Sequence, residues 1–512
     1  MDLRRVAVLG GGPAGLLAAR LLRRARPKTH VTVFERQPPG GTYGFGVVLH
    51  HRAVDRLAEV DPEVNAAIVG LGHPLRRWTL ARDGEAVTVR NEGGFGVGRA
   101  ALLRTLADAA VRSGVEVRAG APVTPDDVAD ADLVIAADGM GSAARTSVQD
   151  HLGVSLEPLD LAYMWCGAPI SPDGMLLSLR RQGASVLAAH VMPYGPDRST
   201  FQVDTALDTL RASDLPAPGE PIDGEDSDAR SMGLVGRVFA AELEGARVEG
   251  NRSRWSTFTT VRCRRWWHGR LVLVGDAAHT AHYTVGSGTR MAMEDSIALV
   301  AALDGHGTLA SALDAYEAER MPAVAHLQTR ARRSQGWWLS VRHRVEAPVP
   351  RLMLSYLTRT GSPDHRGVAA TNPELLSGAA RLLPGADPEA RRPSEMIASS
   401  PLPLADRTVS SRLLREAVRV RLAAVDAAGV EAWTPAADAV VSRARAAIDQ
   451  GAELVLVRGM DGRGGVADLL AVAEQVRLLA GVPVAAGGSA DEEDDLALGV
   501  LAGRADAALV HG

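Results

Sequence analysis

The chain has 512 residues, 46% of them apolar and 23% charged, and at about 100–200 residues per domain this length leaves room for about three domains with hydrophobic cores. Acidic and basic residues nearly balance, 61 against 56, so the net charge of −5 excludes a broad electrostatic field for nucleic acid or an anionic membrane. The only lysine is Lys28, which excludes a P-loop and argues against a Schiff-base mechanism.

The two cysteines and the N-terminal segment indicate in which cellular compartment the protein is expected. Cys166 and Cys263 form no CxxC pair, so the sequence indicates neither a disulfide framework nor a cysteine zinc site, and we predict no metal. The first apolar stretch ends at Gly10–Pro13, which makes it too short for a signal peptide or a membrane span. We therefore expect a cytoplasmic protein whose partners are small molecules and copies of itself, without nucleic acid or membrane.

Hydrophobic periodicity gives the first 340 residues a βαβ pattern that is interrupted by an antiparallel part. In chain order we predict a strand over 5–9, a glycine turn, a helix over 16–22, a strand over 31–34, a helix over 99–112, strands over 115–117 and 133–136, short alternating segments including 184–191 and 200–205, a strand over 271–274, and helices over 289–303 and 309–334. The predicted fold class is α/β, with a Rossmann-like dinucleotide-binding domain over 1–150 and 255–340 and an inserted antiparallel-sheet domain over 151–254.

The C-terminal part begins with a stretch rich in proline, serine, arginine and glycine. Residues 341–408 are predicted to be a helical or linker region, in which 361–408 form a loosely packed connection. Residues 409–512 follow a strand–helix–strand–helix–strand pattern at the spacing of parallel βα units, which predicts a small α/β domain.

The segment Gly10-Gly11-Gly12-Pro13-Ala14-Gly15 fits GxGxxG between a predicted strand and a predicted helix. Such glycines let the backbone approach a pyrophosphate at the helix N-terminus, where free N–H groups and the helix dipole favour an anion. Glu35, about 20 residues after the turn, ends the next strand and can accept ribose hydroxyls. Arg36 could stack near an adenine, although a solvated charge is the simpler interpretation.

Two further acidic residues follow buried strands, and the motifs around them distinguish a FAD site from an NAD site. They are Asp138 in Ala137-Asp138-Gly139-Met140-Gly141-Ser142 and Asp276 in Gly275-Asp276-Ala277-Ala278-His279. A carboxylate at a strand end can bind the polyol of an extended cofactor, and each one alone is equally compatible with an ordinary turn or helix cap.

Taken in order, the three motifs resemble the class A flavoprotein aromatic monooxygenases, the group of para-hydroxybenzoate hydroxylase, over residues 1–340. The resemblance implies that 1–150 and 255–340 bind FAD, that 151–254 bind the substrate, and that NAD(P)H is a co-substrate without a domain of its own. It assigns Asp276 to the ribityl chain, Arg99 to a position along the cofactor, and Asp138 to the motif shared by NAD(P)H and FAD.

The segment after Asp276 both matches and departs from this family. Gly286-Ser287-Gly288-Thr289 corresponds to the family's glycine pair before a helix, but Tyr283 stands where the family usually has a proline. A helix that begins near Gly288 would direct its free N–H groups at the flavin N1/O2 edge and favour the anionic reduced flavin.

The segments 44–49 and 279–289 resemble those of 2-aminobenzoyl-CoA monooxygenase and salicylyl-CoA 5-hydroxylase, and also the tryptophan-hydroxylating flavoprotein of violacein synthesis. These enzymes act on electron-rich aromatic rings in aromatic degradation or natural-product biosynthesis. The resemblance therefore implies a FAD-dependent monooxygenase that hydroxylates such a ring with NAD(P)H and O₂ via a C4a-hydroperoxyflavin. The aromatic substrate can be free, CoA-linked or a natural-product intermediate.

His50, His282 and Tyr283 lie in segments expected to reach the ring of the substrate. Each could deprotonate or orient a substrate hydroxyl, amine or indole N–H, and a purely structural role is the alternative for each.

The C-terminal segments 483–488 and 503–507 resemble the last strands of an old yellow enzyme barrel. Only about 110 residues are available, whereas a (β/α)₈ barrel needs roughly 250, so the resemblance implies a degenerate partial barrel that buries surface or mediates homo-oligomer assembly. Gly487 and Gly488 correspond to a phosphate-binding turn for FMN, and residual FMN binding is the minor alternative.

The sequence leaves three other functions to compare with hydroxylation. A FAD-dependent reductase or dehydrogenase on the same scaffold is the main alternative, because the sequence does not determine oxygen access. A protein that holds FAD as a structural element is a second alternative. A flavin-dependent halogenase is disfavoured, since Lys28 precedes the second strand and no WxWxIP segment occurs.

Overall fold

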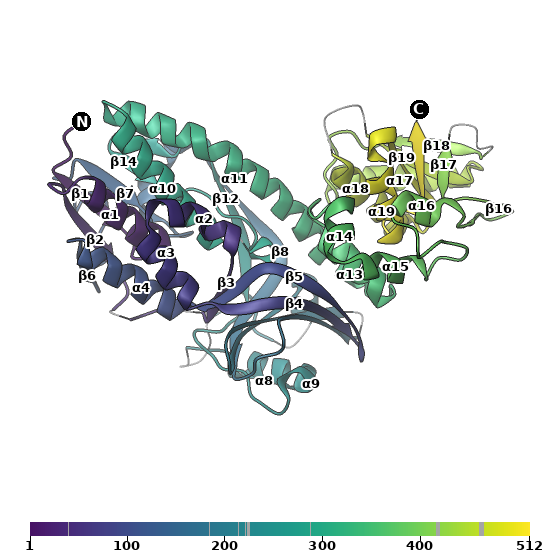
Figure 1. Cartoon of the computed structure of the whole chain (residues 1–512), viewed down its shortest axis with the longest axis horizontal. Helices are drawn as coiled ribbons and strands as arrows, with labels where there is room; N and C mark the ends of the chain where they lie inside the picture. Colours follow the sequence, from purple (N-terminus) through teal and green to yellow (C-terminus); the bar gives the residue numbers. More distant parts are fainter. Residues whose placement is uncertain are drawn as a thin grey trace. The chain divides into compact units, whose positions relative to one another are not determined.

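A computed structural model describes residues 1–38, 40–42, 44–183, 185–212, 215–220, 222, 226–286, 288–415, 420–459 and 465–511. These residues form two compact units (Figure 1). The first unit comprises Met1–Trp78, Asn91–Arg180 and Leu187–Ala331, and the second comprises Thr79–Arg90, Arg181–Val186 and Arg332–Gly512. None of the described helices combines the length and the apolar composition that crossing a bilayer requires.

A six-stranded sheet in the first unit has the order β13–β14–β7–β1–β2–β6. Its strands are β1 (Arg5–Leu9), β2 (His30–Glu35), β6 (Glu116–Ala119), β7 (Leu133–Ala136), β13 (Trp267–His268) and β14 (Leu271–Leu273). All neighbouring strands are parallel except β13 and β14. The predicted βαβ opening is confirmed, because α1 (Pro13–Ala25) connects β1 to β2.

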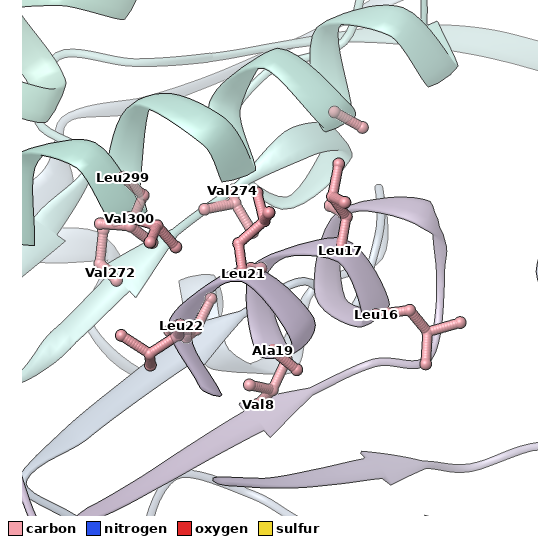
Figure 2. Close-up of a cluster of buried hydrophobic side chains, with 14 of the residues drawn as sticks. Val8, Leu16, Leu17, Ala19, Leu21, Leu22, Val272, Val274, Leu299 and Val300 are labelled. Atoms are coloured by element: carbon pink, nitrogen blue, oxygen red, sulfur yellow. The ribbon is translucent and has the colours of Figure 1, made fainter. Parts of the chain in front are cut away.

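Helix α1 packs against α10 (Gly288–Gly305) beside this sheet. The consecutive residues Ala14–Leu22 of α1 are all buried, so this part of the helix is enclosed by the sheet and by neighbouring helices. Figure 2 shows the resulting cluster, which contains Leu16, Leu17, Ala19, Leu21 and Leu22 of α1, Val8 of β1, Val272 and Val274 at β14, and Leu299 and Val300 of α10. Burying a leucine side chain fully contributes about 1.5–3 kcal/mol to stability relative to leaving it exposed. The cluster therefore holds α1 and α10 against the sheet, beside the turns that contain the sequence motifs.

An eight-stranded sheet has the order β12–β8–β11–β10–β9–β4–β5–β3. Its strands are β3 (Gly46–His50), β4 (His73–Arg82), β5 (Glu85–Gly98), β8 (Val154–Ala168), β9 (Met175–Gln182), β10 (Ser185–Gly195), β11 (Arg198–Ala206) and β12 (Ser256–Cys263). The pairs β8–β11, β10–β11 and β8–β12 are antiparallel, as the alternating pattern predicts.

The other helices of the first unit connect and cover these sheets. They are α2 (His51–Val60), α3 (Pro62–Gly70), α4 (Arg99–Arg112), α5 (Ala143–Ser147), α6 (Gln149–Leu152), α7 (Leu207–Arg211), α8 (Ala229–Val238) and α9 (Ala240–Leu243), with the short 3₁₀ turns η1 (Gly275–Ala277) and η2 (Tyr283–Val285). The long helix α11 (Leu309–Leu339) contains the division between the units, which therefore comes earlier than the boundary expected after residue 340.

The second unit contains an open sheet of five parallel strands in the order β17–β21–β20–β19–β18. The strands are β17 (Leu413–Arg415), β18 (Leu422–Asp426), β19 (Leu454–Arg458), β20 (Val484–Ser489) and β21 (Ala507–His511), and β15 (Leu402–Pro403) pairs with β16 (Thr408–Val409). The helices are α12 (Val341–Arg344), α13 (Val349–Thr358), α14 (His365–Thr371), α15 (Pro373–Ala380), α16 (Pro393–Ala398), α17 (Pro435–Asp449), α18 (Val466–Ala480) and α19 (Glu493–Leu501), with the 3₁₀ turn η3 (Ala490–Glu492).

Residues 361–408 differ from the loose connection expected of their composition. They form α14, α15 and α16 with buried side chains such as Leu376 and Ile397, and α16 packs against α19. Pro373 and Pro393 begin α15 and α16. A proline costs no hydrogen bond in the first turn of a helix, so these prolines mark helix starts instead of a linker.

Candidate active site

The turn after β1 is tight, and two of its positions require glycine. Gly10 has a φ of +107°, and a Cβ at Gly15 would collide with the carbonyl oxygen of Gly10. Gly12 caps α1 without a side-chain hydrogen bond, and Pro13 follows it in the first turn. The N-terminus of α1 therefore offers backbone N–H groups to an anion, and Gly12 has open space where a Cβ would be.

Glu35 lies beside this turn at the end of β2. Its Oε2 accepts a hydrogen bond from the Gly11 N–H at 2.7 Å, and its Oε1 accepts one from the Gln37 N–H at 2.7 Å. Arg36 is exposed. Two backbone donors therefore hold the carboxylate against the glycine turn.

Asp138 and Asp276 follow the neighbouring parallel strands β7 and β14, so their turns meet at the same edge of the sheet. Arg145 joins these turns, because its guanidinium donates to the Ala277 carbonyl at 2.9 Å and to the Met140 carbonyl at 2.6 Å. Asp138 Oδ2 accepts the Ala144 N–H at 3.2 Å, while its buried Oδ1 has no hydrogen-bond partner among the described residues.

Asp276 remains accessible to solvent although protein surrounds it. Desolvation raises its pKa above the ordinary value, while the positive fields of His279 and Arg99 act in the opposite direction. Arg99, the first residue of α4, is thereby placed within electrostatic reach of Asp276.

A buried ionic network holds the turn that contains Asp276. Asp295 of α10 accepts the Gly275 N–H at 3.0 Å, lies 2.7 Å from His279 Nε2, and accepts from Arg320 Nε at 2.8 Å. Burial alone would raise the pKa of Asp295, but His279 and Arg320 outweigh it and lower the pKa. His279 therefore helps to hold the turn through its contact with Asp295.

The loop from Tyr283 to α10 carries the second glycine motif. Gly286 takes a left-handed conformation with a φ of +62°, and α10 begins at Gly288 as predicted. Thr289 lies in the first turn of α10 and is half-buried. Ser287 lies outside the described residues.

The antiparallel sheet has two chemically different faces. Alternate residues of β8 and β11 such as Met164 and Phe201 pack with α8 and α9 in an apolar core. Cross-strand register places the intervening residues on the opposite face, where Tyr163 pairs with Asp204 and Trp165 with Gln202. The term aromatic face is used here for six side chains on this second face, Tyr163, Trp165, His190, Gln202, Asp204 and Ser256; Ala188, Met192 and Thr200 also lie on this side of the sheet.

Tyr283 links the cofactor-motif loop to this aromatic face. Its hydroxyl donates to Asp204 Oδ1 at 2.9 Å, and its ring centroid lies 5.0 Å from that of Tyr163 and 6.1 Å from that of Trp165. His282 is buried, with its Nδ1 2.8 Å from the Thr284 hydroxyl and its ring 5.1 Å from Phe258. Burial, followed by the Asp204 charge, raises the pKa of Tyr283 well above its usual range.

His50 has different surroundings from the other two catalytic candidates. It is exposed at the end of β3, where its ring packs against Gly93 of β5. The structure therefore brings His282 and Tyr283 together, 4.1 Å apart between ring centroids, and places His50 at the β3–β5 pair.

The glycine pair of the C-terminal sheet is adjacent to an acid. Glu492 Oε2 accepts hydrogen bonds from the Ser489 N–H at 3.0 Å and from the Ser489 hydroxyl at 3.1 Å, and a Cβ at Gly488 would collide with the same carboxylate. A carboxylate of the chain itself thus engages the backbone and hydroxyl donors of Ser489, directly after the glycine pair.

Residues 125–331 match the family described as "FAD binding domain", and residues 8–58 match the "NAD(P)-binding Rossmann-like domain". The chain is 35% identical to 3-hydroxy-4-methyl-anthranilyl-[aryl-carrier protein] 5-monooxygenase of Streptosporangium sibiricum over 71% of this chain and 97% of that protein. The chain belongs to the FAD-dependent aromatic monooxygenases.

Two further matches describe the extent of this likeness. The monooxygenase is 38% identical to salicyloyl-CoA 5-hydroxylase of a Streptomyces species over 65% of this chain and 65% of that protein, so it matches slightly less than two thirds of that relative's length. The tetrameric form of 2-methyl-3-hydroxypyridine-5-carboxylic acid oxygenase has a TM-score of 0.54 at 20% identity, over 70% of this chain and 96% of that chain, and this likeness concerns the fold.

The residues of the monooxygenase fit FAD on their own geometry. An uncapped helix N-terminus suits a pyrophosphate, and the orphaned Asp138 Oδ1 and the accessible Asp276 are acceptors that suit hydroxyl groups. All of these groups lie at the ends of adjacent parallel strands, where open α/β sheets bind ligands.

Sequence reasoning missed Asp204, Gln202 and His190 of the monooxygenase. One signal was present, because the strand expected over 200–205 alternates apolar and polar residues and places Gln202 and Asp204 on one face. Arg320 and Asp295 were also missed, since their partners lie far away in the sequence.

Proposed function

We propose that this monooxygenase hydroxylates an electron-rich aromatic ring with FAD, NAD(P)H and O₂, in aromatic degradation or natural-product biosynthesis. The names of two relatives, which specify a CoA thioester and an aryl-carrier-protein substrate, support aromatic acids carried as thioesters as the first class to test. Free aromatics and other natural-product intermediates come next. The observation that carries the proposal is the Tyr283–Asp204 hydrogen bond, because it joins the loop between two cofactor motifs to the aromatic face.

We assign the cofactor to the edge where β1, β7 and β14 end. The pyrophosphate would lie at the turn formed by Gly10, Gly12, Pro13, Ala14 and Gly15, and the ribose would bind Glu35, with Arg36 nearby. Asp276 would bind the ribityl hydroxyls, with Arg99 and Asp138 alongside. The flavin ring would lie at the start of α10, at Gly286, Gly288 and Thr289. Bound FAD would accept hydride from NAD(P)H and supply activated oxygen to the substrate ring. The N-terminal end of α10 would favour negative charge on the ring system.

The three catalytic candidates receive different roles. Tyr283 stays protonated at neutral pH because its pKa is raised, so it can position a ring and cannot serve as a resting base. His282 lies against Tyr283 and Phe258, which supports a role in shaping the ring site. His50 is exposed, which supports contact with solvent or with the mobile end of a substrate.

We also propose the following division of labour. Residues 1–150 and 255–340 bind FAD, 151–254 bind the substrate, and 341–408 with 409–512 serve packing or homo-oligomer assembly as an old-yellow-enzyme-like partial barrel. A cytoplasmic location is proposed with this. The open sheet β17–β21 supports assembly, since its outer strands have unpaired edges unless another element covers them.

The experiment starts from the flavin spectrum of the purified protein and then measures NAD(P)H oxidation. The panel contains aromatic acids, their CoA thioesters, tryptophan derivatives and phenolic natural products, with Asp276→Ala as the control variant whose response should weaken because it binds FAD less tightly. Stimulation by an aromatic compound, with a hydroxylated product, supports the proposal. A folded, colourless protein that cannot be reconstituted with FAD contradicts it, and product formation without oxygen favours a reductase or dehydrogenase.

A further inference from the structure

The aromatic face contains one buried carboxylate and no permanent cation. Asp204 is 2% exposed, and none of the six residues of the face is arginine or lysine. The face is otherwise built from aromatic rings and neutral polar groups. A ligand placed against it would therefore meet negative charge in surroundings that screen charge weakly.

Among the described residues, the side chains within hydrogen-bond distance of Asp204 are donors or groups that can act as donors. Oδ1 accepts from Gln202 Nε2 at 2.8 Å and from the Tyr283 hydroxyl at 2.9 Å, and Oδ2 lies 3.0 Å from His190 Nε2. These contacts fix the position of the Asp204 carboxylate. His190 is the one residue of the face that can become positive, and it is already directed at Asp204.

We infer that Asp204 sets the charge preference of the substrate site, so that the site accepts a neutral aromatic ring with hydroxyl or amino donors and rejects a ring that carries a free carboxylate. This inference rests on the proposed function, because it takes the aromatic face as a wall of that site. A ring carboxylate would lose water, would find no unengaged cation on the face, and would be repelled by Asp204.

Two pairs of compounds offer the same aromatic ring with and without the negative charge of a carboxylate. Salicylamide and salicylate form one matched pair, and 2-aminobenzamide and 2-aminobenzoate form another. The amide and the acid of each pair keep the same ring and the same donor group. The dissociation constant of each compound is measured on the FAD-containing protein from the change in flavin absorbance, together with the NAD(P)H oxidation that each one stimulates.

We expect the wild-type protein to bind each amide at least tenfold more tightly than its acid. Asp204→Asn keeps an acceptor for Tyr283 and removes the charge. The ratio of the acid's dissociation constant to the amide's should therefore fall at least tenfold or approach one. His190→Gln removes the group that can offset Asp204, so the ratio should stay at least as large as in the wild type. Ser256→Ala changes a neutral group on the same face and should leave the ratio unchanged.

The ratio of the dissociation constants of acid and amide separates an electrostatic role of Asp204 from a structural one, because a damaged site weakens the binding of the amide and of the acid alike. Equal binding of acid and amide by the wild type overturns the inference, even without any variant, and leaves the proposed hydroxylation standing. Failure of both amides to bind also overturns it. If in addition no aromatic compound stimulates NAD(P)H oxidation, the proposed function fails as well.

Discussion

Replacing Gly12 by valine is expected to leave the fold intact and to abolish tight FAD binding. Gly12 has an extended backbone, with a φ of −77° and a ψ of 179°, which valine adopts readily, and a Cβ there meets no atom within 4 Å. The new side chain would occupy the space in front of the α1 N-terminus. Loss of two hydrogen bonds to a charged phosphate, at about 1.5–3 kcal/mol each, amounts to about 3–6 kcal/mol, or about 10²–10⁴-fold in Kd.

The assay is a titration of the apoprotein with FAD, followed by flavin fluorescence, together with thermal unfolding of the apoprotein. Gly70→Val is the matched control, because Gly70 also has open space and lies in α3. Gly15→Ala should behave in the opposite way and lower the unfolding temperature, since its Cβ collides with the Gly10 carbonyl. A Gly12→Val protein with unchanged Kd for FAD would refute the assignment of this turn to the pyrophosphate.

Three further outcomes are expected. Asp276→Ala should weaken FAD binding by about 1–3 kcal/mol, because an acceptor for the ribityl hydroxyls is lost, and an unchanged Kd with unchanged turnover would contradict that role. Asp295→Asn should destabilise the first unit by about 3–5 kcal/mol at pH 7 in urea unfolding, because it removes the charged partner of Arg320 and His279. The folded-state pKa of Asp295 is lowered, so its contribution is present above the unfolded value of about 3.9 and is lost as pH falls through the folded value; a difference between wild type and variant that stayed constant in acid would contradict this. Cutting the chain near residue 400 should yield insoluble or differently assembled protein, because α16 packs on α19, and an unchanged assembly size in gel filtration would count against this packing.

The cofactor edge could be predicted because each of its parts is a local pattern. A strand, a glycine turn and a helix are contiguous at Gly10–Gly15, and Asp138 and Asp276 each follow a short buried strand. Parallel strands end at one edge, so patterns far apart in sequence converge there without further information. The bridge made by Arg145 between the two acidic turns was not predictable, since a guanidinium can reach many carbonyl groups.

The aromatic face could be predicted only in part. Tyr283 was singled out because it replaces an expected proline, but its partner Asp204 depends on the register between β8, β10 and β11. Register joins residues from separate strands, and one residue of slip would turn Asp204 to the apolar face. The stretch 361–408 was misjudged because composition does not distinguish a proline in a loop from one that begins a helix.

The most direct test of the central claim uses labelled oxygen. The FAD-containing protein is incubated with NAD(P)H, an aromatic substrate found in the screen and ¹⁸O₂, and the product is examined by mass spectrometry. We predict that each product molecule contains one oxygen atom from O₂ and that no product forms under anaerobic conditions. Product formed without O₂, or product whose new oxygen comes only from water, would contradict the assignment as a monooxygenase.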